Sequence, residues 1–125
     1  MKPTVQEYLD RADEFLGAAE ALMESKFFSI AAGRAYYAMF HAVTAALLAR
    51  GIHRSSHHGT IAAFGEFLTK PGLVEKRFHT WLQNAFEGRG DGDYSPVPTS
   101  SPEIARIQIE RAREIIRICR QLCES

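Results

Sequence analysis

The residues best suited to chemistry in this 125-residue sequence lie in one glycine-rich run, residues 88–94. Arg89 is followed there by Asp93 and Tyr94. Arginine presents a planar fork that matches two phosphate oxygens, and its charge does not titrate near neutral pH. A tyrosine can stack on a base or donate its hydroxyl to a phosphate. The run therefore predicts a phosphate site. The alternative is structural, with Arg89 capping a helix end and pairing with Asp93.

A second polar group interrupts the apolar stretch 29–50. At about 100° per residue, four residues fall on one narrow line of a helix, namely Arg34, Tyr37, His41 and Thr44. A guanidinium and an imidazole on such a helix must be hydrogen-bonded or face a cleft, because burying them unpaired costs several kcal/mol. A satisfied core network and a functional site both account for this line.

Three of the five histidines are close in sequence, at His53, His57 and His58. They lack zinc-type Cys/His spacing, and the adjacent His57 and His58 point in different directions on a helix. We therefore expect no metal site and no cofactor. His58, at a predicted helix start, could bond locally or meet an anion. His79 is expected to be exposed.

The element that must position these groups is a helix over 29–50, which is apolar on almost every side, as in the centre of a bundle. Small side chains form one seam, where another helix can approach closely. Bulky side chains form a second seam that fills core volume. The small seam is Ala31, Ala35, Ala38, Ala42, Ala45 and Ala49, and the bulky seam is Tyr36, Phe40, Val43 and Leu47.

Four more helices are expected around this one. A capping box at Thr4–Glu7 starts a helix that runs to about Ser25. Ser55 or Ser56 caps a third helix that stops before Pro71, a fourth spans about 72–88, and Ser101 caps the last. The glycines and prolines after residue 87 predict a loop up to that cap. The sequence therefore predicts one all-α domain over residues 1–125, an antiparallel up-and-down bundle of four to five helices.

Composition narrows the class of protein. Lys plus Arg and Asp plus Glu both number 15, and the resulting zero net charge argues against broad non-specific nucleic-acid binding, although a local basic patch is compatible with it. Cys119 and Cys123, four apart on one helix, predict reduced thiols and a cytoplasmic protein. No signal peptide is recognisable, and Arg34 and His41 break the longest apolar run, which argues against a membrane span.

The order of several motifs resembles a prokaryotic HEPN-domain protein. The residues that carry the resemblance are the string AAGRAYYAMFH over 31–41, then Gly51, then SHHG over 56–59, and finally Arg89 with Asp93 and Tyr94. The resemblance covers most of the chain. It implies an all-α bundle, a homodimer with its cleft at the dimer interface, and a minimal nucleotidyltransferase partner in a toxin–antitoxin module. Many members of the family are metal-independent ribonucleases.

The nuclease motif of that family, an arginine followed after four to six residues by a histidine, is incomplete here. Arg89 matches the arginine, but Tyr94 stands where the histidine would be. A phenol with a pKa near 10 is a poor general base at neutral pH. His41 or His57 could supply the imidazole from elsewhere in the fold.

The resemblance thus implies a nucleotide- or RNA-binding toxin-side component. A non-catalytic helical dimerisation or interaction module is the alternative. The candidate catalytic residues are Arg89, Tyr94 and His41, and the candidate phosphate contacts are Arg34, Arg89, Asp93, Tyr94, His57 and His58.

We predict a homodimer, because the alanine seam and the apolar edges of the last helix exceed what five helices of a monomer can cover. Light scattering at micromolar concentration should give twice the chain mass. A mass near 14.0 kDa would contradict the prediction.

Overall fold

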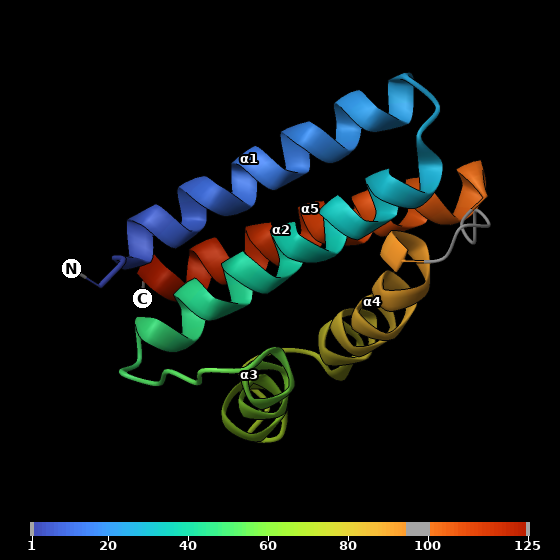
Figure 1. Cartoon of the computed structure of the whole chain (residues 1–125). Coiled ribbons are helices and arrows are strands. Elements are labelled where there is room, and N and C mark those ends of the chain that lie inside the picture. Colours follow the sequence, from blue (N-terminus) through green and yellow to red (C-terminus); the bar gives the residue numbers. More distant parts are fainter. Residues whose placement is uncertain (1, 95–100, 125) are drawn as a thin grey trace.

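The described part of the chain forms five α-helices and one π-helical turn in a computed structural model (Figure 1). The description covers residues 2–94 and 101–124, with residues 89–94 described by their backbone alone. The elements are α1 (Val5–Glu24), α2 (Phe28–Leu48), α3 (His57–Phe64), η1 (Gly65–Thr69), α4 (Lys76–Tyr94) and α5 (Pro102–Glu124). No strand occurs within these described ranges, so the predicted all-α class is confirmed.

The long helices α1, α2, α4 and α5 alternate in direction along the bundle, as predicted for up-and-down topology (Figure 1). α3 lies across them and is seen nearly end-on at one side. α2 is the central element, because it packs against α1, α3, α4 and α5. Groups on different sides of α2 are therefore presented to different neighbours.

The two predicted seams of α2 lie largely in the hydrophobic core. The alanines of the small seam are fully buried from Ala31 to Ala45, whereas Ala49, just past the helix end, is exposed. Tyr36, Val43 and Leu47 of the bulky seam are also buried, and Phe40 is half-buried. Small side chains let neighbouring helices pack at short range, and the large ones fill the volume on the other side.

The predicted caps are confirmed. Thr4 and Glu7 form the capping box of α1, with the Glu7 N–H donating to Thr4 Oγ1 at 3.1 Å. Ser56 caps α3 by accepting from the Gly59 N–H at 2.9 Å, and Ser101 accepts from the Ile104 N–H at the start of α5. Each cap satisfies a backbone donor that the first helical turn leaves unpaired.

The predicted limits of the fourth helix are wrong at both ends. Gly72 has a φ of +85°, a left-handed conformation outside any helix, and α4 begins only at Lys76. At the other end α4 continues through residues 88–94, where a glycine-rich loop was predicted. Glycine costs only about 1 kcal/mol in a helix interior. Proline is a stronger signal for a helix end than glycine, because it disfavours the helical conformation of the residue before it, and the first proline after Lys76 in the sequence is Pro96. The rest of the predicted loop, residues 95–100, lies outside the described residues.

The expectation that His79 is exposed is also wrong. Its ring is half-buried against Phe64, with centroids 6.3 Å apart. A Cβ added at Gly65, the first residue of η1, would lie 3.0 Å from His79 Nε2. Glycine at this position therefore lets α4 approach the π-helical turn.

Four arginines of α5 form ion pairs on a solvated face, namely Arg106, Arg113, Arg117 and Arg120. Arg113 pairs with Glu20 and Arg120 with Asp13, so two of these pairs join α5 to α1. Exposed pairs of this kind contribute roughly 0–1 kcal/mol each. Cys119 is buried and Cys123 half-buried, and both are free thiols. Among the described helices, none has the length and apolar character needed to cross a membrane.

The alanine seam predicts a position-dependent effect of enlargement. Ala42→Leu should lower the free energy of unfolding by about 1–3 kcal/mol, because the buried position has no room for the extra carbons. Ala49→Leu, at the exposed end of the same seam, should change it by no more than about 0.5 kcal/mol. Urea unfolding of both variants measures the difference. Equal effects would show that the seam is not tightly packed.

Candidate functional site

His57 is held in a fixed position where α2 and α3 meet. It is the first residue of α3, and its Nδ1 lies 2.6 Å from the hydroxyl of Tyr36, which is fully buried in α2. The imidazole stacks on the ring of Phe40, with centroids 4.1 Å apart and planes at 12°. A hydrogen bond at one edge and a ring against one face fix both the position and the orientation of the imidazole.

Further rings extend this contact to α4. The edge of Tyr37 meets His57 at a centroid distance of 5.9 Å, and Phe86 of α4 lies 6.1 Å from His57 and 5.8 Å from Tyr36. We call the group formed by Tyr36, Tyr37, Phe40, His57 and Phe86 the aromatic cluster. All its members except Tyr36 are half-buried, so the cluster reaches the surface where α2, α3 and α4 converge.

The predicted residues of the glycine-rich run follow Phe86 along α4. Arg89 and Asp93 are three and seven residues beyond Phe86, which are positions one and two turns further along the same side of a helix. Tyr94, eight residues beyond, occupies an adjacent register position. The helical extension of α4 therefore brings the backbone of Arg89 within one turn of the aromatic cluster. The side chains of these three residues lie outside the description.

Arg34 contacts the same cluster from the preceding turn of α2. Its guanidinium lies 5.8 Å from the centroid of the Tyr37 ring, a cation–π arrangement. The side chain is half-buried, so its charged end lies between the core and the surface. Alanine at this position should cost about 0.5–2 kcal/mol, the range between an exposed and a desolvated cation–π pair, because the half-buried guanidinium contacts the Tyr37 ring.

His41 lies on the α1 side of Phe40. Its Nδ1 is 2.8 Å from the carbonyl oxygen of Tyr37. The centroid of its ring lies 5.1 Å from that of Phe15 and 6.1 Å from that of Tyr8. Burial lowers the pKa of His41, the hydrogen bond to Tyr37 opposes that shift, and the charge of Arg11 reinforces it. The imidazole is therefore predominantly neutral at physiological pH.

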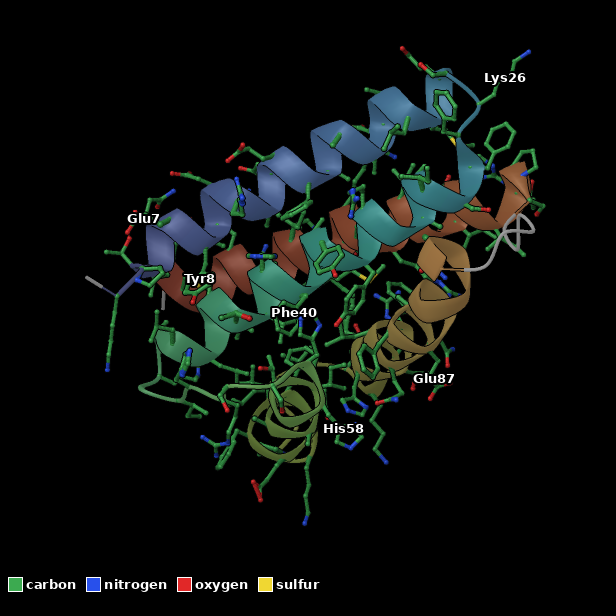
Figure 2. The ribbon with its side chains drawn as sticks, viewed as in Figure 1. Glu7, Tyr8, Lys26, Phe40, His58 and Glu87 are labelled. Carbon is green, nitrogen blue, oxygen red and sulfur yellow. The ribbon has the colours of Figure 1, made fainter. Side chains whose placement is uncertain are left out.

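A groove of about 420 Å³ opens beside His41. Three carboxylates and one guanidinium lie along it, and Figure 2 shows two of its residues, Glu7 and Tyr8, on the first turn of α1. Its lining residues are Pro3, Glu7, Tyr8, Asp10, Arg11, Glu14 and His41.

The other two neighbouring histidines are not part of the aromatic cluster. His53 and His58 are exposed. Figure 2 shows His58 on α3, the helix that begins at His57. The predicted phosphate contact of His58 therefore has no support from the geometry of the aromatic cluster. Among the described side chains, those of residues 2–88 and 101–124, no group of three metal-ligating residues is found.

Sequence reasoning missed the partners of His57. Tyr36 was interpreted as core, and Phe86 was not singled out. Tyr36 and His57 are 21 residues apart, so no helical spacing relates them. The reversal of the chain after α2, where Gly51 has a φ of +75°, brings the two together.

Comparison with known proteins agrees with this architecture. The protein-family model of the HEPN domain matches residues 5–122 of this sequence. The chain belongs to the HEPN-domain family. The resemblance noted in the sequence is thereby confirmed.

Among relatives of this HEPN chain is a UPF0332 protein of Gloeobacter violaceus, 34% identical over 94% of both chains. A protein of Methanocaldococcus jannaschii named "Putative toxin MJ0605" is 30% identical over 99% of this chain and 92% of its own length. The crystal structure of ST0689, described as an archaeal HEPN homologue, superposes with a TM-score of 0.75 at 17% identity. It covers 98% of this chain and 99% of that one, which establishes the shared fold.

The lowered pKa of His41 predicts a pH dependence of stability. In the unfolded HEPN chain His41 titrates near its ordinary value of 6.5, so the unfolded state binds the proton more tightly than the folded state. The free energy of unfolding should therefore fall as the pH decreases through that value. His41→Phe should reduce the loss of stability between about pH 7.5 and about pH 5.5. Exposed His53→Gln is the control, and urea unfolding at both pH values gives the comparison. An identical loss in wild type and His41→Phe would contradict the assignment.

Proposed function

We propose that this HEPN protein binds RNA at the aromatic cluster, as the toxin-side component of a pair with a minimal nucleotidyltransferase. Residues 1–125 act as one domain in this proposal, and a homodimer forms the complete cleft. The observation that supports it best is the fixed imidazole of His57. That imidazole lies against Tyr36, Phe40 and Phe86, one helical turn from the backbone of Arg89.

The chemistry of the cluster suits single-stranded RNA. The half-buried rings of Tyr37, Phe40 and Phe86 bring aromatic surface to the edge of the bundle. A base that stacks on such a ring contributes about 1–3 kcal/mol. Arg34 beside Tyr37 and Arg89 beyond Phe86 supply the positive charge for phosphates. Because the chain has no net charge, binding depends on this local combination and not on a general electrostatic attraction.

His57 accounts for the departure from the family's nuclease motif. Tyr94 stands in the place of the motif histidine, and a phenol does not exchange protons efficiently at neutral pH. In this proposal His57, one of the two substitutes considered from the sequence, supplies the imidazole from α3. The proposal is binding. Cleavage of the bound RNA is measured separately, in the presence of EDTA, because HEPN nucleases need no metal.

Toxin-named relatives support the toxin-side role, since the HEPN chain is similar to two proteins of Methanocaldococcus jannaschii with that printed name. The nucleotidyltransferase partner follows from the family resemblance. The alternative is a helical interaction module in which the same residues organise only the core and the dimer.

Arg89→Ala should weaken RNA binding by about 1.5–3 kcal/mol without lowering the melting temperature, the range for a lost charge-assisted contact. His57→Gln should weaken it as well. The measurement is fluorescence anisotropy with a labelled single-stranded RNA oligonucleotide, combined with a thermal melt. Arg117→Ala is the matched charge control, because Arg117 is exposed on α5 and pairs with Glu114. Unchanged affinity with a lowered melting temperature would make Arg89 a structural residue of α4 and favour the interaction module.

A further inference from the structure

We propose that the surface where the first turns of α4 meet α5 docks a segment of a partner protein. That segment presents one carboxylate to Arg111 of α5 and apolar side chains to a groove beside Phe78 of α4. The surface is separate from the proposed RNA site. Phe86 joins α4 to the aromatic cluster on the side of α2 and α3, whereas Trp81 of α4 contacts Arg111 on the side of α5.

Arg111 differs from the other arginines of α5. The others form ion pairs with carboxylates, whereas the half-buried Arg111 pairs with no carboxylate of a described residue. Its guanidinium lies 5.2 Å from the centroid of the Trp81 ring. An aromatic ring attracts the charge but does not replace the oxygen acceptors that the five N–H groups of a guanidinium can bind. Arg111 is therefore available to an oxyanion from outside the described part of the chain.

A second guanidinium contacts the same indole ring. Arg77 of α4 lies 5.1 Å from the Trp81 centroid, and its charge is offset by Glu75, whose carboxylate is 3.3 Å from the Arg77 Nε. Two cations beside one ring repel each other, and the charge of Arg111 has no such offset. A carboxylate fits a guanidinium with two parallel N–H···O bonds. One carboxylate at Arg111 would therefore balance the charge of this site.

An apolar groove of about 240 Å³ adjoins the two arginines. Phe78 lines the groove and also lies 4.6 Å from the guanidinium of Arg77 and 5.2 Å from Trp81, measured at the ring centroids. Leu73 of its wall is 58% exposed, more than any other large hydrophobic residue in the described part of the chain. The groove is also lined by Val74, Ile118 and Leu122. Tryptophan and arginine beside an apolar pocket are typical of the residues that dominate binding between proteins.

The two parts of this surface define the chemistry of the partner. Ile118 follows Arg111 by seven residues, which is two turns along the same side of α5, or about 10 Å. An amphipathic helix that lies along α5 can present a carboxylate and its apolar residues at that same spacing. RNA fits less well, because Glu75 lines the groove and Glu114 lies one turn beyond Arg111. Both carboxylates repel a chain of phosphates.

Selection of peptides from a random display library on the immobilised full chain tests the surface without a known partner. The enriched peptides should carry Asp or Glu near apolar residues, and their binding should change the fluorescence of Trp81, the single tryptophan of the chain. Arg111→Gln should weaken these peptides by about ten- to hundredfold, the range for a lost charge-assisted contact. Leu73→Gln should weaken them as well. Selections that yield no peptide dependent on Arg111 and Leu73 would overturn the proposal.

Arg113→Gln is the matched control, because Arg113 is an exposed arginine of the same helix and pairs with Glu20 of α1. It should leave the affinity of the peptides unchanged. Thermal melts accompany every variant, and Leu73→Gln, at an exposed position, decides the outcome if Arg111→Gln lowers the melting temperature.

Two other occupants are tested with Arg111→Gln. Loss of a dimer in light scattering would assign the surface to a second copy of this chain, and weaker binding of single-stranded RNA would assign it to nucleic acid. Either result would overturn the docking of a partner protein. A chain that selects acidic peptides at Arg111 but binds no RNA would contradict the proposed function and leave the docking surface standing.

Discussion

Close packing along the alanine seam of α2 determines where the other groups of this protein can lie. Ala35, Ala38 and Ala42 have no exposed surface, so larger side chains at these positions would force neighbouring helices apart. Because the alanine seam packs against other helices, the large rings of α2 lie on the remaining sides of this helix. Those sides face α3 and α4 at one edge and the first turns of α1 at the other. The aromatic cluster and the His41 groove are two results of the same packing.

Polar groups on this apolar helix are satisfied in two different ways. His41 and Thr44 bond to carbonyl oxygens of their own helix, at Tyr37 and Phe40, each one turn earlier and at 2.8 Å. Tyr36 instead bonds across to another helix, through His57. A bond within one helix places no demand on the rest of the fold, whereas the bond between helices holds only while α3 stays docked on α2. Both avoid the several kcal/mol that an unpaired buried polar group would cost.

Local signals in the sequence predicted local structure well. The capping box at Thr4, the cap at Ser56 and the seams of α2 depend on residues within a few positions of one another. The caps are confirmed, and so is the burial of the small seam from Ala31 to Ala45, whereas Ala49 is exposed. The end of α4 was mispredicted because single glycines weaken a helix without stopping it. The pairing of Tyr36 with His57 could not be predicted, since it depends on the path of the chain between two helices. Resemblance to the HEPN family supplied the fold, but it could not place the imidazole of His57, which lies outside the family's nuclease motif.

The alanines of α2 also bear on the thermodynamics of recognition. Alanine loses no rotamer freedom when it is buried, so this helix is ordered at little side-chain entropy cost. The rings on its other faces are carried by a backbone that folding has already made rigid. A ligand that reaches Phe40 and Tyr37 therefore meets a preorganised surface, and the entropy lost on association is mainly that of the ligand itself.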